Sequence, residues 1–301
     1  MKVAIISDLH LGVADSKANQ FLFSDAAFAG LLDRLAAEVD WVLIAGDIFE
    51  LWEGDDLVPP QTEELFRRIC ESWPLTIKSI AGLSNVVPLS GNHDAAARLK
   101  GWLPKAREEV FVPELSLFVA HGHQGDRGIY KPKSSRLCFV ECLACCLGGG
   151  EELGFGDELD QLTSQVLARA NAESPAALRV YARDVAARAG VNVVCFGHTH
   201  EPELTNDGGV VYANSGACVG KRETVDVVLV ESSGSRVVVA LGRRRPGGFF
   251  ERTAVAEAVA AVHRTDALAL PPGAVMSQSA SGTAMIEGGR LLSLGGSVLR
   301  M

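Results

Sequence analysis

Short apolar runs alternate with longer amphipathic segments through most of this chain. Helical periodicity lies over Asn19–Glu38 and Gln61–Ser72. The apolar runs are the expected strands, and they cover Lys2–Ile6, Trp41–Ala45, Asn85–Leu89, Ser116–Ala120 and Val191–Phe196. Because strands that alternate with helices build layered folds, the pattern predicts an α/β protein. With 48% of its 301 residues hydrophobic, the chain can also fill a sizeable core.

Later segments depart from this alternation. Three β-rich runs with no helix between them predict a more antiparallel section of sheet, and they cover Gly209–Ala213, Thr224–Val230 and Arg236–Leu241. Residues 122–190 are helical in composition, and we interpret them as a cap inserted into a domain of residues 1–241. Residues 242–301 are rich first in Arg, then in Ala and finally in Gly and Ser, and we expect them to form a C-terminal appendage.

Six of the seven histidines lie at or just after the ends of expected strands. The polar motifs that follow the strands are Asp8-Leu9-His10, Gly46-Asp47, Gly91-Asn92-His93-Asp94, His121-Gly122-His123 and Gly197-His198-Thr199-His200. Because the carboxyl ends of strands in an open α/β sheet face one crevice, we expect these motifs to converge. Residues i and i+2 of an extended segment point the same way, so each D-x-H or H-x-H pair should face one site.

The converging side chains offer carboxylate and amide oxygens together with imidazoles, but no thiolate. Such a donor set suits Mn²⁺, Fe or Zn²⁺ better than a structural cysteine-type zinc site. The set exceeds the needs of one ion, so it would serve two ions about 3.5–4 Å apart with a bridging carboxylate, an arrangement used for phosphoryl displacement. We therefore expect two divalent metal ions as cofactors, with Mn²⁺ preferred and Fe or Zn²⁺ as the alternatives.

In this order, the motifs resemble those of the calcineurin-like metallophosphoesterases over about residues 1–241. The resemblance implies two mixed β-sheets flanked by helices, with a helical cap insertion. It implies that one metal is held by Asp8, His10, Asp47 and His200, and a second by Asp47, Asn92, His121 and His198. His93 matches the family's non-ligand histidine, which stabilises the transferring phosphoryl group or protonates the leaving group.

The segment after Asp47 indicates which branch of this family the chain resembles. Glu50 keeps an acid found in protein serine/threonine phosphatases, but Leu51 replaces the Arg that follows it there, which disfavours a protein phosphatase. The run of residues 49–56 is similar to that of UDP-2,3-diacylglucosamine hydrolases, which cleave a pyrophosphate in the lipid A pathway and release UMP. That group typically has Arg at the position of His93 and Asp at the position of His123. A small-nucleotide phosphodiesterase or phosphomonoesterase, and a non-catalytic metal-binding scaffold, are the alternative functions.

Further residues are candidates for catalysis or substrate binding. We expect Glu50 to orient His93, with a solvated loop acid as the alternative. Asn214 and Ser215 match a family turn near the metals, and a plain Asx turn is the alternative. A substrate phosphate is expected to contact His123, Arg127, Lys131 and Arg136, although the basic run could also be a solvated loop.

Charge and composition bear on partners and location. Lys and Arg number 28 against 37 Asp and Glu, and the net charge of −9 disfavours a nucleic acid polymer as partner. We expect a small-molecule or lipid-linked phosphate, with peripheral membrane contact through the apolar Leu137–Leu147 of the cap as a further hypothesis. The sequence shows neither a signal peptide nor a membrane-spanning stretch, so a cytoplasmic location is predicted, with the inner face of the membrane as the alternative. Four cysteines are expected to be helical neighbours, with a metal or lipid-modified cluster as the alternative: Cys138, Cys142, Cys145 and Cys146.

Overall fold

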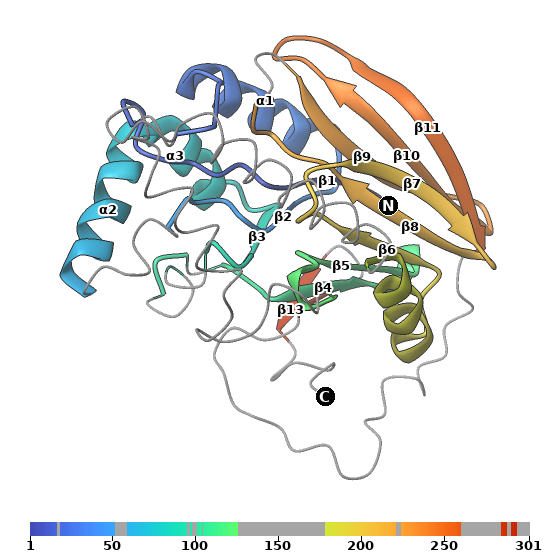
Figure 1. The fold of residues 1–301 in the computed structure, drawn as a ribbon. Coiled ribbons are helices and arrows are strands. Elements are labelled where there is room, and N and C mark those ends of the chain that lie inside the picture. The colour runs from blue at the N-terminus through green and yellow to red at the C-terminus, as the bar shows by residue number, and fades with distance from the viewer. Residues whose placement is uncertain are drawn as a thin grey trace, which may run out of the picture.

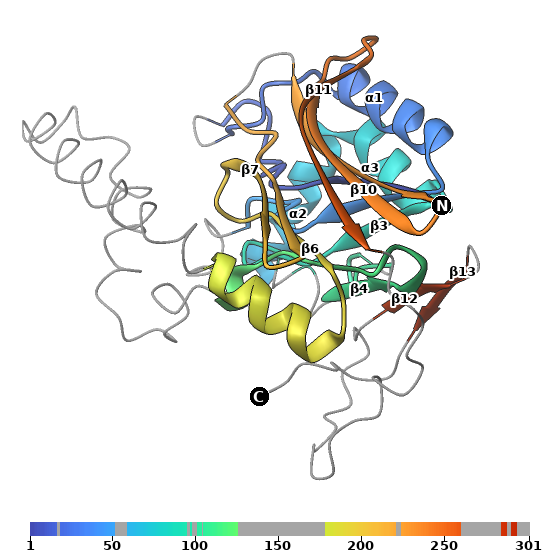
Figure 2. The ribbon, with the colours of Figure 1, turned by 90° about the vertical axis from the view of Figure 1, so that its right-hand side faces the viewer.

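Two mixed β-sheets pack face to face and carry helices on both outer faces (Figures 1 and 2). The computed structural model describes residues 1–16, 19–51, 59–94, 97, 101–103, 105–125, 178–220, 224–259, 284–287 and 290–293. The architecture confirms the expected fold of two mixed sheets flanked by helices. The basic residues Arg127, Lys131 and Arg136, the apolar segment Leu137–Leu147 and its cysteines lie outside the described residues.

The first sheet has the strand order β11-β10-β9-β1-β2-β3. Its parallel half contains β1 (Lys2–Ile6), β2 (Trp41–Ala45) and β3 (Val86–Leu89). Its antiparallel half contains β9 (Val225–Ser233), β10 (Arg236–Arg244) and β11 (Phe250–Val259). Thus β10 passes the boundary expected at residue 241, and β11 extends the same sheet. These strands are not an appendage, because Leu241 and Ala258 are buried in the core between the sheets.

The second sheet has the strand order β13-β12-β4-β5-β6-β8-β7. Its strands are β4 (Glu109–Val112), β5 (Leu117–Ala120), β6 (Val193–Phe196), β7 (Pro202–Asp207), β8 (Val210–Ser215), β12 (Ala284–Glu287) and β13 (Arg290–Ser293). A short 3-10 helix, η2 (Pro113–Leu115), joins β4 to β5. Because β5 and β6 are parallel, the loops that leave them emerge at the same edge of the sandwich.

Helices cover the outer faces of both sheets. On the first sheet lie α1 (Asp25–Glu38), α2 (Pro59–Ser72) and α3 (Pro74–Gly82). A helix over residues 178–189 packs Leu178, Ala182 and Val185 against the second sheet, so this end of the expected cap belongs to the sandwich (Figure 2). Every helix within the described ranges is too short or too polar to span a bilayer.

The central strand β1 shows how the sequence builds these layers. Val3 and Ile5 point into the core between the two sheets, whereas Ala4 and Ile6 pack beneath the helices. A strand that is covered on both faces reads as a continuous apolar run, which is the pattern of residues 3–6. The apolar run ends at Ser7, and the first polar motif begins with the next residue.

Candidate metal centre

The structure brings the polar motifs after β1, β2, β3, β5 and β6 together at one edge of the sandwich. Three overlapping groups of side chains place their potential ligand atoms within 4.8 Å of one another. The groups are Asp8, His10 and His200; His10, Asp47 and His93; and Asp47, His121 and His198. Asn92 joins the last group, because its Oδ1 lies 3.1 Å from His121 Nε2. All seven expected ligands are therefore neighbours in space.

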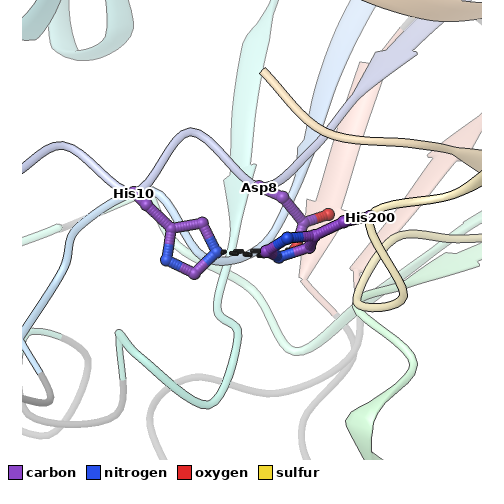
Figure 3. Close-up of side chains that lie close together, drawn as sticks. All are labelled: Asp8, His10 and His200. Carbon is purple, nitrogen blue, oxygen red and sulfur yellow. Dashed lines mark hydrogen bonds and ion pairs between the residues drawn. The ribbon is translucent and has the colours of Figure 1, made fainter. Parts of the chain in front are cut away.

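The first group points a carboxylate and two imidazoles at one position (Figure 3). His10 Nε2 lies 3.1 Å from His200 Nε2, and Asp8 Oδ1 lies 3.3 Å from His200 Nε2. The same Asp8 oxygen is buried and makes no hydrogen bond within the described part of the chain. Two facing ring nitrogens and a buried carboxylate oxygen fit a divalent cation, which satisfies all three lone pairs at once.

Asp47 lies between the first group and the remaining histidines. Its Oδ2 is 3.0 Å from His121 Nε2 and 3.7 Å from His10 Nε2. His121 Nδ1 donates a hydrogen bond to the carbonyl of Ala45 at 2.8 Å, which turns Nε2 toward Asp47 and Asn92. One carboxylate therefore reaches histidines of both ligand sets, which is the position of a bridging ligand.

Burial makes the charges of this centre strongly interdependent. Burial by itself would raise the pKa of Asp8, but His10 and His200 outweigh it and hold the pKa below its ordinary value. Burial would likewise lower the pKa of His121, but the charge of Asp47 raises this pKa to about 9. The buried carboxylates thus attract positive charge, which protons on the imidazoles or divalent cations can supply.

Glu50 connects His10 with His93. Its Oε2 accepts a hydrogen bond from His10 Nδ1 at 2.8 Å, and its Oε1 accepts one from His93 Nδ1 at 2.8 Å. Burial would raise the pKa of Glu50, but these two hydrogen bonds lower it to about 2. With its side chain 15% exposed, Glu50 is not a solvated loop acid, and it orients a second ring besides the expected His93.

His93 sits beside the expected ligand sets. Its Nε2 lies 3.9 Å from Asp47 Oδ2, and its ring meets that of His10 edge to face with centroids 4.5 Å apart. The backbone N–H of His93 donates to Asp47 Oδ1 at 2.9 Å, so this residue also helps to fix the central carboxylate.

The loops that carry these residues differ from the extended segments expected from the sequence. Six non-glycine residues in the described part of the chain have a positive φ, and five of them are candidate ligands: Asp8, His10, Asp47, His198 and His200, with φ between 46° and 74°. In such turns residues i and i+2 need not point the same way. His198 accordingly joins Asp47 and His121, whereas His200 joins Asp8 and His10.

A buried carboxylate, that of Asp94, supports the loops after β2 and β3. Asp94, to which the sequence analysis assigned no role, accepts hydrogen bonds from the backbone N–H groups of Ile48, Phe49 and Gly91 at 2.8–3.1 Å. Burial and the charge of Asp47 raise the pKa of Asp94 to about 6. Its position next to the Asn-His pair places it close to the site, but nothing in the sequence indicates which groups it binds.

Asn214 forms an Asx-type turn, and it also contacts the G-H-x-H motif. Its Oδ1 accepts from the N–H of Gly216 at 2.9 Å. Its Nδ2 donates to the carbonyl of Gly197 at 2.6 Å and lies 3.1 Å from Thr199 Oγ1. Beside it, the Ser215 hydroxyl lies 2.7 Å from that of Ser7, so the turn is tied to the end of β1.

His123 lies at the margin of the centre, in the short 3-10 helix η3 (His123–Gly125). Its ring centroid is 5.5 Å from that of His121 and 6.4 Å from that of His198. This places it near enough to contact a group bound over the centre. The other expected substrate-binding residues lie outside the described part of the chain.

Comparison with known proteins identifies a family match over about two thirds of the chain. A family model described as calcineurin-like phosphoesterase matches residues 1–202. Among solved structures, a dimetal phosphatase from Danio rerio aligns with a TM-score of 0.49 and 12% identity, over 87% of this chain and 99% of its own. A Vps29 from Entamoeba histolytica complexed with zinc aligns with a TM-score of 0.39 and 18% identity, over 84% of this chain and 98% of its own.

Curated relatives match over a shorter stretch. A UDP-2,3-diacylglucosamine hydrolase from a Shewanella species is 39% identical over 69 residues, which are 23% of this chain and 26% of the relative. The enzyme of the same name from Hahella chejuensis is 35% identical over 69 residues, again 23% and 26%. That from Bordetella pertussis is 43% identical over 54 residues, which are 18% and 19%. The matched stretch thus spans about a quarter or less of these relatives.

Proposed function

This chain belongs to the calcineurin-like phosphoesterase family, a family of metal-dependent phosphoesterases, and from that premise we propose that it hydrolyses a phosphoester or pyrophosphate bond at the centre around Asp47. The observation that carries the proposal is the position of Asp47 Oδ2 between His121 Nε2 and His10 Nε2. Candidate ligands on both sides of one carboxylate favour two metal ions over one.

The donor set fits two divalent ions, for which we propose Mn²⁺, with Fe or Zn²⁺ as alternatives. Asp8, His10, Asp47 and His200 would hold one ion, and Asp47, Asn92, His121 and His198 the other. Bound there, two such ions would make an attacking water more acidic and would neutralise charge on the phosphoryl oxygens. The protein contributes a largely buried ligand set: Asp8 and His121 are fully buried, whereas the His200 side chain is 40% exposed.

His93 is the proposed catalytic residue that is not a ligand. Glu50 accepts from His93 Nδ1, so a second proton on the ring would be held at Nε2, which lies 3.9 Å from Asp47 Oδ2. We assign this Nε2–H to the stabilisation of the transferring phosphoryl group or to protonation of the leaving oxygen. Glu50 acts through His93 and His10 as a positioning residue.

For the substrate we propose a small-molecule or lipid-linked phosphate, and most specifically a UDP-2,3-diacylglucosamine-like pyrophosphate that yields UMP. The proposal is supported by the names of the curated relatives and by the run of residues 49–56. His123, Arg127, Lys131 and Arg136 would bind its phosphates. The cytoplasmic location and the membrane contact of the cap remain predictions.

A substrate panel tests this proposal. The protein, stripped of metal and reloaded with Mn²⁺, is assayed with UDP-2,3-diacylglucosamine, with unacylated UDP-glucosamine and with an activated phosphodiester. Release of UMP from the acylated compound alone supports the specific substrate, whereas turnover of the soluble diester alone supports a nucleotide phosphodiesterase. Loss of all turnover in Asp47→Asn, but not in the exposed Asp207→Asn control, ties the activity to the centre. Absence of any metal-dependent hydrolysis in the wild type contradicts the proposal.

A further inference from the structure

A second site candidate lies on the outer face of the first sheet, beside the end of α1. There a cavity of about 140 Å³ is walled by apolar side chains that include Leu35, Leu229, Ala240 and Phe250. No residue of the metal centre lines it. Lys2, which begins β1, is part of its wall, whereas the metal centre begins after the other end of that strand. The cavity is therefore separate from the proposed active site.

Arg244 is the unusual residue of this cavity. Its side chain is only 4% exposed, and its two terminal nitrogens each donate to a carboxylate oxygen of Glu38 at 2.5 Å. Its Nε is buried and has no hydrogen-bond partner within the described part of the chain. A guanidinium carries five N–H donors, and a buried donor without an acceptor is costly. An acceptor on a bound group would remove this cost at the Nε edge of Arg244.

The charges around the cavity indicate the sign of that group. Three cations and two carboxylates line it: Lys2, Arg244, Arg252, Glu38 and Glu231. The hydrogen bond from Arg244 lowers the pKa of Glu38, so this carboxylate is ionised at neutral pH. One positive charge remains in excess, which favours a ligand with a single negative charge.

We propose that this cavity binds a monocarboxylate with a short apolar body. Its carboxylate would accept hydrogen bonds from the Nε–H edge of Arg244, the side-on geometry in which arginine binds planar carboxylates in a bidentate manner. Its apolar body would lie against Leu35, Leu229 and Phe250. The size is suitable, since a cavity of about 150 Å³ accommodates a molecule as large as benzene.

Titration with hexanoate tests the proposal on the full chain, loaded with diamagnetic Zn²⁺ so that amide shifts can be followed by NMR. Hexanoate should shift the amides of Leu229 and Ala240 and bind at least about tenfold more tightly than 1-hexanol, which lacks the charge, or acetate, which lacks the apolar body. Equal binding of hexanol, or shifts confined to the metal centre, would overturn the proposal. The measurement does not depend on hydrolysis, so it can fail while the proposed function holds.

Matched variants locate the binding. Arg244→Lys keeps a cation beside Glu38 but lacks the guanidinium edge, and it should weaken hexanoate binding about tenfold. Arg236→Lys, at the other end of β10 and paired with Glu257 on the surface, is the control that should bind normally. Ala240→Leu fills the cavity without removing a charge, and it should weaken binding by at least as much. Unchanged affinity in both Arg244→Lys and Ala240→Leu would contradict the assignment.

Discussion

The two halves of the first sheet differ in the types of residue that have a positive φ in their turns. After the parallel strands β1 and β2, the chain places Asp8, His10 and Asp47 in left-handed conformations that are uncommon for any residue except glycine. In the antiparallel half, the turn between β9 and β10 gives the positive φ of 62° to Gly234, and a side chain there would meet open space. The first half thus has positive φ values at polar residues as well as at Gly46, whereas the described turns of the second half have them at glycines alone.

This difference separates turns that position candidate ligands from turns that only connect strands. Strained conformations cost about 1–3 kcal/mol each and persist only where the surroundings enforce them. Asp94 and Asn214 provide that enforcement at the metal centre through buried hydrogen bonds. The strain is therefore consistent with a centre whose ligands must be held in place before a metal or substrate binds.

Among the substitutions in the parallel half, Asp47→Ala should cause the largest loss of hydrolysis. Because Asp47 contacts histidines of both ligand sets, its loss should reduce hydrolysis by about 10³-fold or more and lower the content of both metals. Steady-state rates with an activated phosphodiester and metal analysis of the same sample check this. Retention of both metals in the variant would argue against a bridging role.

His93→Ala should keep the metals and lose rate. We expect a decrease in kcat of about 10²–10⁴-fold, since His93 is assigned to proton transfer or charge stabilisation. Metal content measured beside kcat separates the two roles. If the variant loses metal and excess Mn²⁺ restores its activity, His93 belongs to the ligand set instead.

The same substitution in each half of the sheet gives a direct comparison: Gly91→Ala in the parallel half and Gly234→Ala in the antiparallel half. A methyl group on Gly91 would collide with the carboxylate and backbone of Asp47, so this variant should bind metal more weakly and lose activity. On Gly234 the same methyl group meets nothing, and we expect only about 1 kcal/mol of lost stability from the left-handed backbone. Urea unfolding and metal titration of both variants check this. Equal effects of the two changes would remove the distinction between the halves.

A further expected effect is on the acid stability of the metal-free protein. Glu50 has a pKa of about 2 in the fold and an ordinary value of 4.5 when unfolded. Its contribution to stability is thus fully present above pH 4.5 and is lost as the pH falls toward 2. Glu50→Gln should lose stability relative to wild type above pH 4.5, and the difference should shrink as the pH falls. Urea unfolding at pH 6, 4.5 and 3 measures it, and a constant difference would contradict the pKa assignment.

Much of the candidate site could be predicted because its residues follow apolar strands directly. β1, β2 and β3 are buried on both faces and therefore stand out in the sequence. The role of Asp94 could not be predicted, because it depends on N–H groups that approach from the loop after β2. The split of His198 and His200 between two groups depends on their φ values, which the residue types do not reveal.

Peripheral strands were harder to predict than central ones. β7 consists mostly of polar residues and lies at the edge of the second sheet, so it has no apolar alternation to recognise. β11 is rich in Ala and Glu, which favour helix, and only its pairing with β10 makes it a strand. In both cases tertiary contacts outweigh the local preference of the chain.

In the proposed function, Asp47 joins two metal sites. The most direct test of this role is the number of Mn²⁺ ions bound per chain after chelation and reconstitution, measured for the wild type, His200→Ala and His198→Ala. We predict about two ions per chain for the wild type. Each variant should bind one of the two ions more weakly, and the weakened ion should differ between the variants, because these histidines belong to different groups. A wild-type value near one, with both variants losing that same ion, would contradict the account.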